Sequence, residues 1–149
     1  MTITQAQADV LSAYLQRIGF QGHVFDPNDH DESVHLIPIP EGEPFWVFSF
    51  KPSVSPRVIN GGNMFTYGVS TGSFDALVLK ISNWNEDAIK QGMKTLKAGG
   101  VVFMCVHREV RSGDRALFAH LNIAFKETLT VNHDGKTNSV MVGQYRGKA

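Results

Sequence analysis

The chain has 149 residues, a length that suits one domain (1–149) burying about two thirds of its unfolded surface. Its 14 basic and 14 acidic residues balance, which argues against a dedicated nucleic-acid binder, because such proteins usually carry excess Lys and Arg. No apolar run approaches the roughly 18 residues of a membrane span, and the N-terminus lacks a signal-peptide pattern. We therefore expect a single-domain cytoplasmic protein that does not bind a membrane.

The cysteine content agrees with this compartment. The single cysteine, Cys105, lies inside an apolar run, so no intramolecular disulfide can form and a reducing environment is expected. Apolar surroundings keep a thiol neutral and unreactive. Cys105 is therefore not a candidate nucleophile.

The first predicted element is an amphipathic helix over residues 4–18. Thr4 and Gln7 have the spacing of a capping box at its start, and Gly19 ends it. One stripe of apolar side chains predicts the core-facing side: Val10, Leu11, Tyr14, Leu15 and Ile18.

The region from residue 22 to 50 is β-prone. Its β segments are 23–25, 35–39 and 45–50. The turn residues PEGEP at 40–44 favour a small antiparallel ribbon. Residues 51–73 then follow no period, which is typical of a binding loop, a lid or disorder, and we expect at most a short strand at 64–69.

The stretch from residue 74 to 107 predicts strand, helix and strand. Two runs, 74–81 and 101–106, are too apolar to have a solvated face. Between them Asn85 can cap a helix, which we expect Gly99 and Gly100 to end. Two buried strands joined by one helix make a right-handed parallel crossover.

A further helix and a hairpin are predicted after this crossover. Ser112 and Asp114 can start the helix. The apolar residues expected on its buried face are Leu117, Phe118, Leu121, Ala124 and Phe125. Two alternating segments, 127–132 and 139–146, are joined by HDGKTN, whose Asp-Gly pair favours a hairpin turn.

Residues 74–146 resemble the second half of a class I S-adenosylmethionine-dependent methyltransferase. The resemblance rests on the strand FDALVL, the LKAGG turn at 96–100, the strand VVFMCV, the next helix and the terminal hairpin. It implies a three-layer Rossmann-like α/β fold for residues 74–149. Residues 1–73 would add a helix, a β-ribbon and a long loop.

The first 73 residues depart from that family. Its cofactor half has a strand, a glycine-rich turn and an acidic residue at the end of the next strand. Here the only glycine pair, Gly61-Gly62, precedes no clear helix, and KISNWN (80–85) replaces the family's Pro-Pro-Tyr type of motif. We therefore expect this half to be absent or replaced, with no cofactor.

Two functions follow from this departure. The first is a non-catalytic module that binds another protein or forms a homo-oligomer. The alternative is a compact S-adenosylmethionine-dependent methyltransferase whose cofactor pocket is rearranged or completed by a partner.

Ligands of open parallel sheets bind at the carboxyl ends of the strands. Candidate catalytic residues there are Lys80, His107 and Glu109, and candidate cofactor contacts are Ser82, Asn83 and Trp84. Trp84 could stack on a base and Asn83 could pair with its edge, although both would equally serve to start a helix. His107 and Glu109 could form an acid–base pair, although a solvated histidine at a strand end is more common.

One loop is dense in possible metal ligands: Asp26, Asn28, Asp29, His30, Asp31, Glu32 and His35. The glycine and the distal glutamate of a calcium loop are missing. The two histidines have no cysteine partners for a zinc site. We expect a solvated acidic turn and no metal.

Overall fold

The structure is a computed structural model that describes residues 3–26, 37–49, 57–60, 74–80 and 86–147. Its strands are β1 (Gly22–Asp26), β2 (Phe45–Ser49), β3 (Val58–Asn60), β4 (Phe74–Lys80), β5 (Leu96–Val106), β6 (Ile123–His133) and β7 (Lys136–Tyr145). Its helices are α1 (Gln5–Arg17), α3 (Glu86–Lys94) and α4 (Ser112–His120). None of these described helices is long and apolar enough to cross a membrane.

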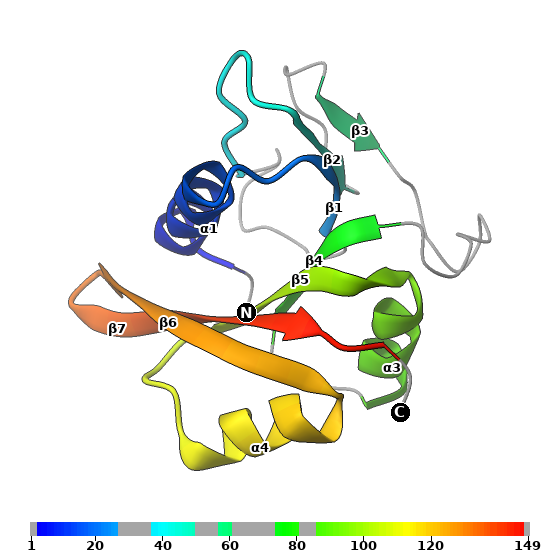
Figure 1. Ribbon diagram of the computed structural model, residues 1–149. Helices are drawn as coiled ribbons and strands as arrows, with labels where there is room; N and C mark the ends of the chain where they lie inside the picture. The colour runs from blue at the N-terminus through cyan, green and yellow to red at the C-terminus, as the bar shows by residue number, and fades with distance from the viewer. Residues whose placement is uncertain (1–2, 27–36, 50–56, 61–73, 81–85, 148–149) are drawn as a thin grey trace.

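The described strands form one seven-stranded sheet in the order β3-β2-β1-β4-β5-β7-β6 (Figure 1). The strands from β3 to β5 in this order are parallel, and β7 is antiparallel to both of its neighbours. The predicted three-layer Rossmann-like α/β fold with a terminal antiparallel hairpin is confirmed.

The N-terminal half contributes three strands to this sheet. β1 and β2 pair in parallel, so the predicted antiparallel ribbon is wrong in strand direction. The reason is that the chain returns to the start of β1 before β2 begins, where the Gly22 amide donates to the Pro44 carbonyl at 3.1 Å. The strands that we expected to be replaced are therefore present.

The long segment predicted to lack structure also supplies a strand. β3 lies in it and pairs in parallel with β2. The strand expected at 64–69 falls outside the described residues. Of the segment 35–39, the described part, 37–39, is not a strand.

The predicted parallel crossover of β4, α3 and β5 is confirmed. One boundary differs, because α3 ends at Lys94 and β5 begins at Leu96, so the two glycines lie in the strand instead of ending the helix. Gly99 has φ +85°, and a Cβ at Gly100 would lie 2.7 Å from Leu96 Cδ1. The pair of glycines thus permits the irregular start of β5, where its register with β4 shifts.

Two hydrophobic cores lie on opposite faces of the sheet. α1 covers one face, and α3 and α4 cover the other (Figure 1). Along β4, Ala76 and Val78 belong to the core under α1. Leu77 and Leu79 belong to the core under α3 and α4. Burial on both faces explains why β4 reads as a continuous apolar run.

The C-terminal hairpin has the predicted turn. Asp134 and Gly135 have φ of 51° and 75°, the left-handed backbone that a type I′ turn requires. Its first strand begins earlier than expected, so Ala124 and Phe125 lie on β6 and not on the preceding helix. Asn122, with φ 61°, reverses the chain between α4 and β6.

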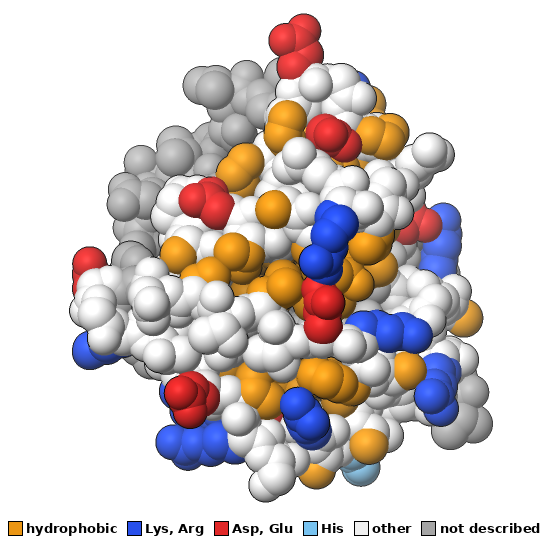
Figure 2. Space-filling view, turned by 60° about the vertical axis from the view of Figure 1, so that its left-hand side comes forward, with side chains coloured by type: hydrophobic (Ala, Val, Ile, Leu, Met, Phe, Trp, Pro, Cys, Tyr) orange, Lys and Arg blue, Asp and Glu red, His pale blue; other side chains and the backbone are white. Residues whose placement is uncertain are grey.

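The surface on the α1 side carries both signs of charge. Arg17 forms an ion pair with Glu127 of β6, and its guanidinium lies 4.9 Å from the centre of the Tyr14 ring. Burial, together with the charge of Glu127, raises the pKa of the Tyr14 hydroxyl, which stays protonated at neutral pH. Figure 2 shows this side, with hydrophobic, basic and acidic side chains interspersed.

Candidate functional site

The order of the strands reverses between β1 and β4. From β1 the chain proceeds outward to β2 and β3, and from β4 it proceeds the other way to β5. Ligands of open α/β sheets bind outside the carboxyl ends of the strands at such a reversal. The strands that reach this edge end in polar residues: Asp26 on β1, Ser49 on β2, Asn60 on β3 and Lys80 on β4.

Asp26 and Ser49 are the most buried polar residues of this edge. Both have no exposed surface, and they are directly opposite in the β1–β2 register. Strand alternation places them on the same face as Val24 and Val47, which belong to the core under α1. A buried carboxylate must be stabilised by hydrogen bonds, and its oxygens accept them from hydroxyl and amino groups.

The Asp26 carboxylate also acts on the thiol of Cys105, which lies on β5. The thiol is buried, and its pKa is raised, first by burial and then by the negative charge of Asp26. The predicted burial of Cys105 is confirmed, and its lack of reactivity stays a prediction. Asp26 therefore lies close enough to β5 for its charge to act across the switch point.

The structure brings two of the predicted site residues to this edge. Lys80 is half-buried and lies opposite Cys105 in the register of β4 and β5. His107, two residues after Cys105, is also half-buried. Their roles stay predictions. Ser82, Asn83 and Trp84 fall outside the described residues.

The chain after β5 is held by one ion pair. Arg108 donates to the two carboxylate oxygens of Asp114 at 2.6 and 2.9 Å, and the Arg111 amide donates to the same carboxylate at 2.9 Å. The hydrogen bond from Arg108 lowers the pKa of the Asp114 carboxyl group, although burial opposes it. Arg108 is thus committed to an internal contact, whereas Glu109 is exposed.

A buried amide connects α1 to the same edge. The Gln7 side-chain nitrogen donates to the Val106 and Ser139 carbonyls at 3.0 and 3.1 Å. Its side-chain oxygen accepts from the Thr4 amide, which completes the predicted capping box. Gln7 therefore fixes the start of α1 against the last residue of β5, next to His107.

The metal prediction concerns residues that are mostly not described. Of the acidic loop, only Asp26 falls within the described residues. The described residues of the whole chain hold no group of three or more potential metal ligands.

Sequence reasoning assigned Asp26 to this loop and missed Ser49. The usable signal was an acidic residue directly after the β-prone segment HVF, which is where a strand ends. Ser49 gave no comparable signal, because FWVFSF continues past it.

No family model matches the sequence, and no curated protein sequence is similar to it at a significant level. Solved structures are similar. One is the Burkholderia thailandensis 1,6-didemethyltoxoflavin-N1-methyltransferase with bound S-adenosylhomocysteine, at TM-score 0.65 and 12% identity over 96% of this chain and 80% of that one. A second is the Synechocystis magnesium protoporphyrin IX methyltransferase with bound SAM, at TM-score 0.66 and 10% identity over 95% and 79%.

A third similar structure is the Aquifex aeolicus tRNA (m1A58) methyltransferase, at TM-score 0.61 and 12% identity over 95% of this chain and 69% of that one. By its layers and its reversed strand order the protein is a doubly wound α/β protein. More particularly, it has the Rossmann-like fold of class I S-adenosylmethionine-dependent methyltransferases. The similarity extends over nearly the whole chain, not over the C-terminal half alone.

Proposed function

We propose that the carboxyl edge at the switch point binds S-adenosylmethionine and that the protein is a compact methyltransferase with a rearranged cofactor pocket. The main support is the complete row of parallel strands, with the buried Asp26 where their order reverses. Two of the similar structures contain bound S-adenosylhomocysteine or SAM.

The residues at this edge fit parts of such a ligand. The Asp26 carboxylate and the Ser49 hydroxyl suit the hydroxyl groups of an adenosyl moiety, and the Lys80 ammonium suits a carboxylate. The segment after β1, PNDHDESVHL, contains no glycine, so the close backbone approach of a glycine-rich turn is not available there. For this reason we call the pocket rearranged.

The bound cofactor would supply a methyl group on a positively charged sulfur. A hydroxyl or amino acceptor must give up a proton as it takes this methyl group. We assign the acceptance of that proton to His107, because histidine is the side chain that most often serves as a general base. Gln7 would keep the end of β5, and with it His107, in place.

Calorimetric and thermal-shift titrations with S-adenosylmethionine and S-adenosylhomocysteine test this proposal. A ligand at 100 times its dissociation constant adds about 2.7 kcal/mol of stability. We expect Asp26→Asn to weaken binding by about tenfold or more, since it removes a charged acceptor. Asp75→Asn makes the same chemical change at the opposite edge, where Asp75 pairs with Lys97, and should leave binding unchanged. No response to millimolar ligand would refute the proposal.

The non-catalytic binding module remains the second candidate. It is favoured by Trp46, whose surface is 39% exposed on β2 with the Arg57 guanidinium 5.1 Å from the ring centre. Exposed tryptophan and arginine are common anchors of protein interfaces. Sedimentation analysis of the wild type and of Trp46→Ala would test for self-association: a dimer that Trp46→Ala dissociates supports this candidate, and a monomeric wild type excludes the homo-oligomer.

A further inference from the structure

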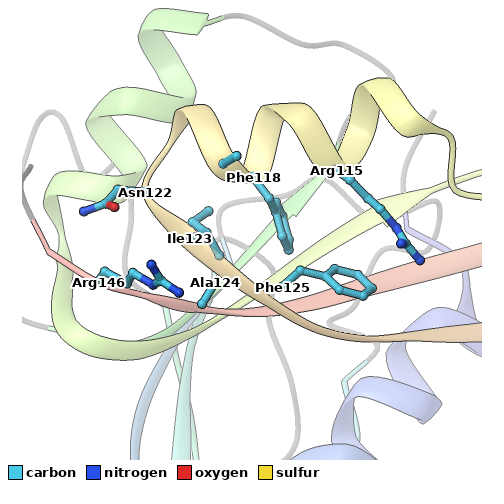
Figure 3. Close-up of a pocket in the computed structure, with 8 residues that line it drawn as sticks. Arg115, Phe118, Asn122, Ile123, Ala124, Phe125 and Arg146 are labelled. Carbon is cyan, nitrogen blue, oxygen red and sulfur yellow. The ribbon is translucent and has the colours of Figure 1, made fainter.

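We propose that the groove between α4 and the outer strands binds a small amphipathic anion, meaning an apolar body that carries a carboxylate or a phosphate. The groove encloses about 300 Å³. It lies where β6 begins and β7 ends (Figure 3). Because β6 runs in the same direction as β5, this place is at the amino edge of the sheet, away from the switch-point site.

The floor of the groove is apolar and closely packed. It is formed by Phe118 and Ala119 of α4 and by Ile123, Ala124 and Phe125 of β6. Phe118 and Ile123 have 0% and 4% of their surface exposed. A Cβ at Gly143 would lie 2.4 Å from Ile123 Cγ2 and 2.8 Å from Phe118 Cε2. The glycine on β7 therefore makes room for these two side chains to pack against the strand. Ala119 is exposed and Phe125 is half-buried, so these two side chains would contact the apolar part of a ligand, with Phe118 and Ile123 packed beneath them.

Two arginines border this floor. Arg115 extends from α4, and its guanidinium lies 4.5 Å from the centre of the Phe125 ring. Arg146 follows β7, and its side chain enters from the other end of the row Ile123–Phe125 (Figure 3). The Arg146 backbone amide donates to the Asn122 carbonyl at 3.0 Å, which fixes its position.

These two guanidiniums differ from others in the molecule. Arg17 is paired with Glu127 and Arg108 with Asp114. Within the described part of the chain, neither Arg115 nor Arg146 forms an ion pair. A guanidinium presents a planar set of donors that matches a carboxylate or phosphate in a bidentate contact. An anion with an apolar body could pair with the guanidiniums at the rim and place its apolar part against the floor of the groove.

An NMR titration of the isotopically labelled full chain tests the proposal. The probes are sodium 2-naphthoate, 2-naphthyl phosphate, the neutral isostere 2-naphthamide and inorganic phosphate. We expect at least one aromatic anion to shift the backbone amide signals of Ala119, Ala124 and Gly143, with a dissociation constant near the millimolar range. Whichever of the two anions binds more tightly identifies the preferred head group. The neutral amide and inorganic phosphate should each bind about tenfold more weakly.

Variants separate charge from shape. Arg115→Gln and Arg146→Gln should each weaken binding about tenfold, because each removes a charged donor. Ala119→Leu keeps both charges but adds bulk to the α4 side of the groove and should weaken binding. Arg17→Gln is the matched control, because Arg17 also lies over an aromatic ring but on the α1 side, and it should bind as the wild type does.

Several results would overturn the proposal. They are no shift with either aromatic anion, equal binding of 2-naphthamide, equal binding of inorganic phosphate, or wild-type affinity in both Arg115→Gln and Arg146→Gln. Correlation spectra and urea midpoints establish that each variant is folded. The outcome does not depend on whether S-adenosylmethionine binds, since that ligand would lie at the other edge of the sheet.

Discussion

The side-chain amide of Gln7 donates hydrogen bonds to β5 and to β7, at the last pair of residues that joins these two strands. Replacing Gln7 with Leu would leave the carbonyls of Val106 and Ser139 buried without this donor. A buried polar group that loses its partner costs about 1–3 kcal/mol. We expect Gln7→Leu to lower the free energy of unfolding by about 2–4 kcal/mol in urea denaturation.

The matched control for this change is Gln16→Leu. Gln16 lies on the same helix but is exposed, with its amide on Ser12. Exposed substitutions of this kind usually change stability by less than about 0.5 kcal/mol. Equal effects of the two variants would show that the buried hydrogen bonds of Gln7 contribute nothing.

Asp114 gives the loop after β5 a pH dependence. Its pKa is lowered in the folded protein, mainly by the hydrogen bond from Arg108. The ion pair therefore stabilises the fold fully above the unfolded pKa of about 3.9, and this contribution is lost as the pH falls through the lower folded value. We expect Asp114→Asn to cost about 2 kcal/mol at pH 7.

The same comparison at acidic pH tests the sign. The difference in unfolding free energy between wild type and Asp114→Asn should shrink below about pH 4, because the wild-type carboxyl group then becomes protonated. Urea titrations at several pH values measure it. A difference that grows towards low pH would contradict the assignment.

The role of a single residue was predictable where it depends only on the neighbouring sequence. The capping box of Thr4 and Gln7 and the turn at Asp134-Gly135 were of this kind, since each depends on neighbours only a few positions away. Asp26 was not, because its importance depends on β1 ending beside β4, more than 40 residues later in the chain. Gln7 was predicted as a cap, but its contacts with Val106 and Ser139 required the folded sheet.

Among the elements, the hairpin of β6 and β7 packs closely against α4. Gly143 allows this contact, because a Cβ there would lie 2.4 Å from Ile123 Cγ2 and 3.0 Å from the Ala124 carbonyl oxygen. We expect Gly143→Ala to lower the free energy of unfolding by about 1–3 kcal/mol, the usual cost of overpacking a core.

Gly113 provides the contrasting substitution. It lies in the first turn of α4, where an added Cβ meets nothing within 4 Å. Gly113→Ala should therefore raise stability by up to about 1 kcal/mol, since alanine favours the helix. Urea or thermal denaturation of both variants measures the difference. A destabilised Gly113→Ala, or a neutral Gly143→Ala, would contradict this account of the packing.

The elements themselves were partly predictable. β4, α3 and β5 were found because buried parallel strands and an amphipathic helix each carry a strong periodic signal. The direction of β1 and β2 was not, because a turn sequence such as PEGEP does not show where the chain has travelled between two strands. The end of α3 was misplaced because a Gly-Gly pair serves equally as a helix stop and as an irregular strand start.

At the scale of the whole molecule, one sheet links both cores. Side chains of β4 alternate between the core under α1 and the core under α3 and α4. We expect one cooperative unfolding transition, with urea curves from tryptophan fluorescence and from far-UV circular dichroism that coincide. Trp46→Phe leaves Trp84 as the remaining fluorescent reporter and should give the same agreement. Separate midpoints would show that the N-terminal and C-terminal halves unfold independently.

β7 is synthesised after both of its neighbours, yet it lies between them in the sheet. In a nascent chain that has not yet delivered Lys136–Tyr145 from the ribosome, β6 lacks the strand with which it pairs, and β5 has an open side. Unpaired strand edges of this kind promote association with other chains. A released chain truncated before residue 136 should therefore expose both edges and be the form that most needs a chaperone.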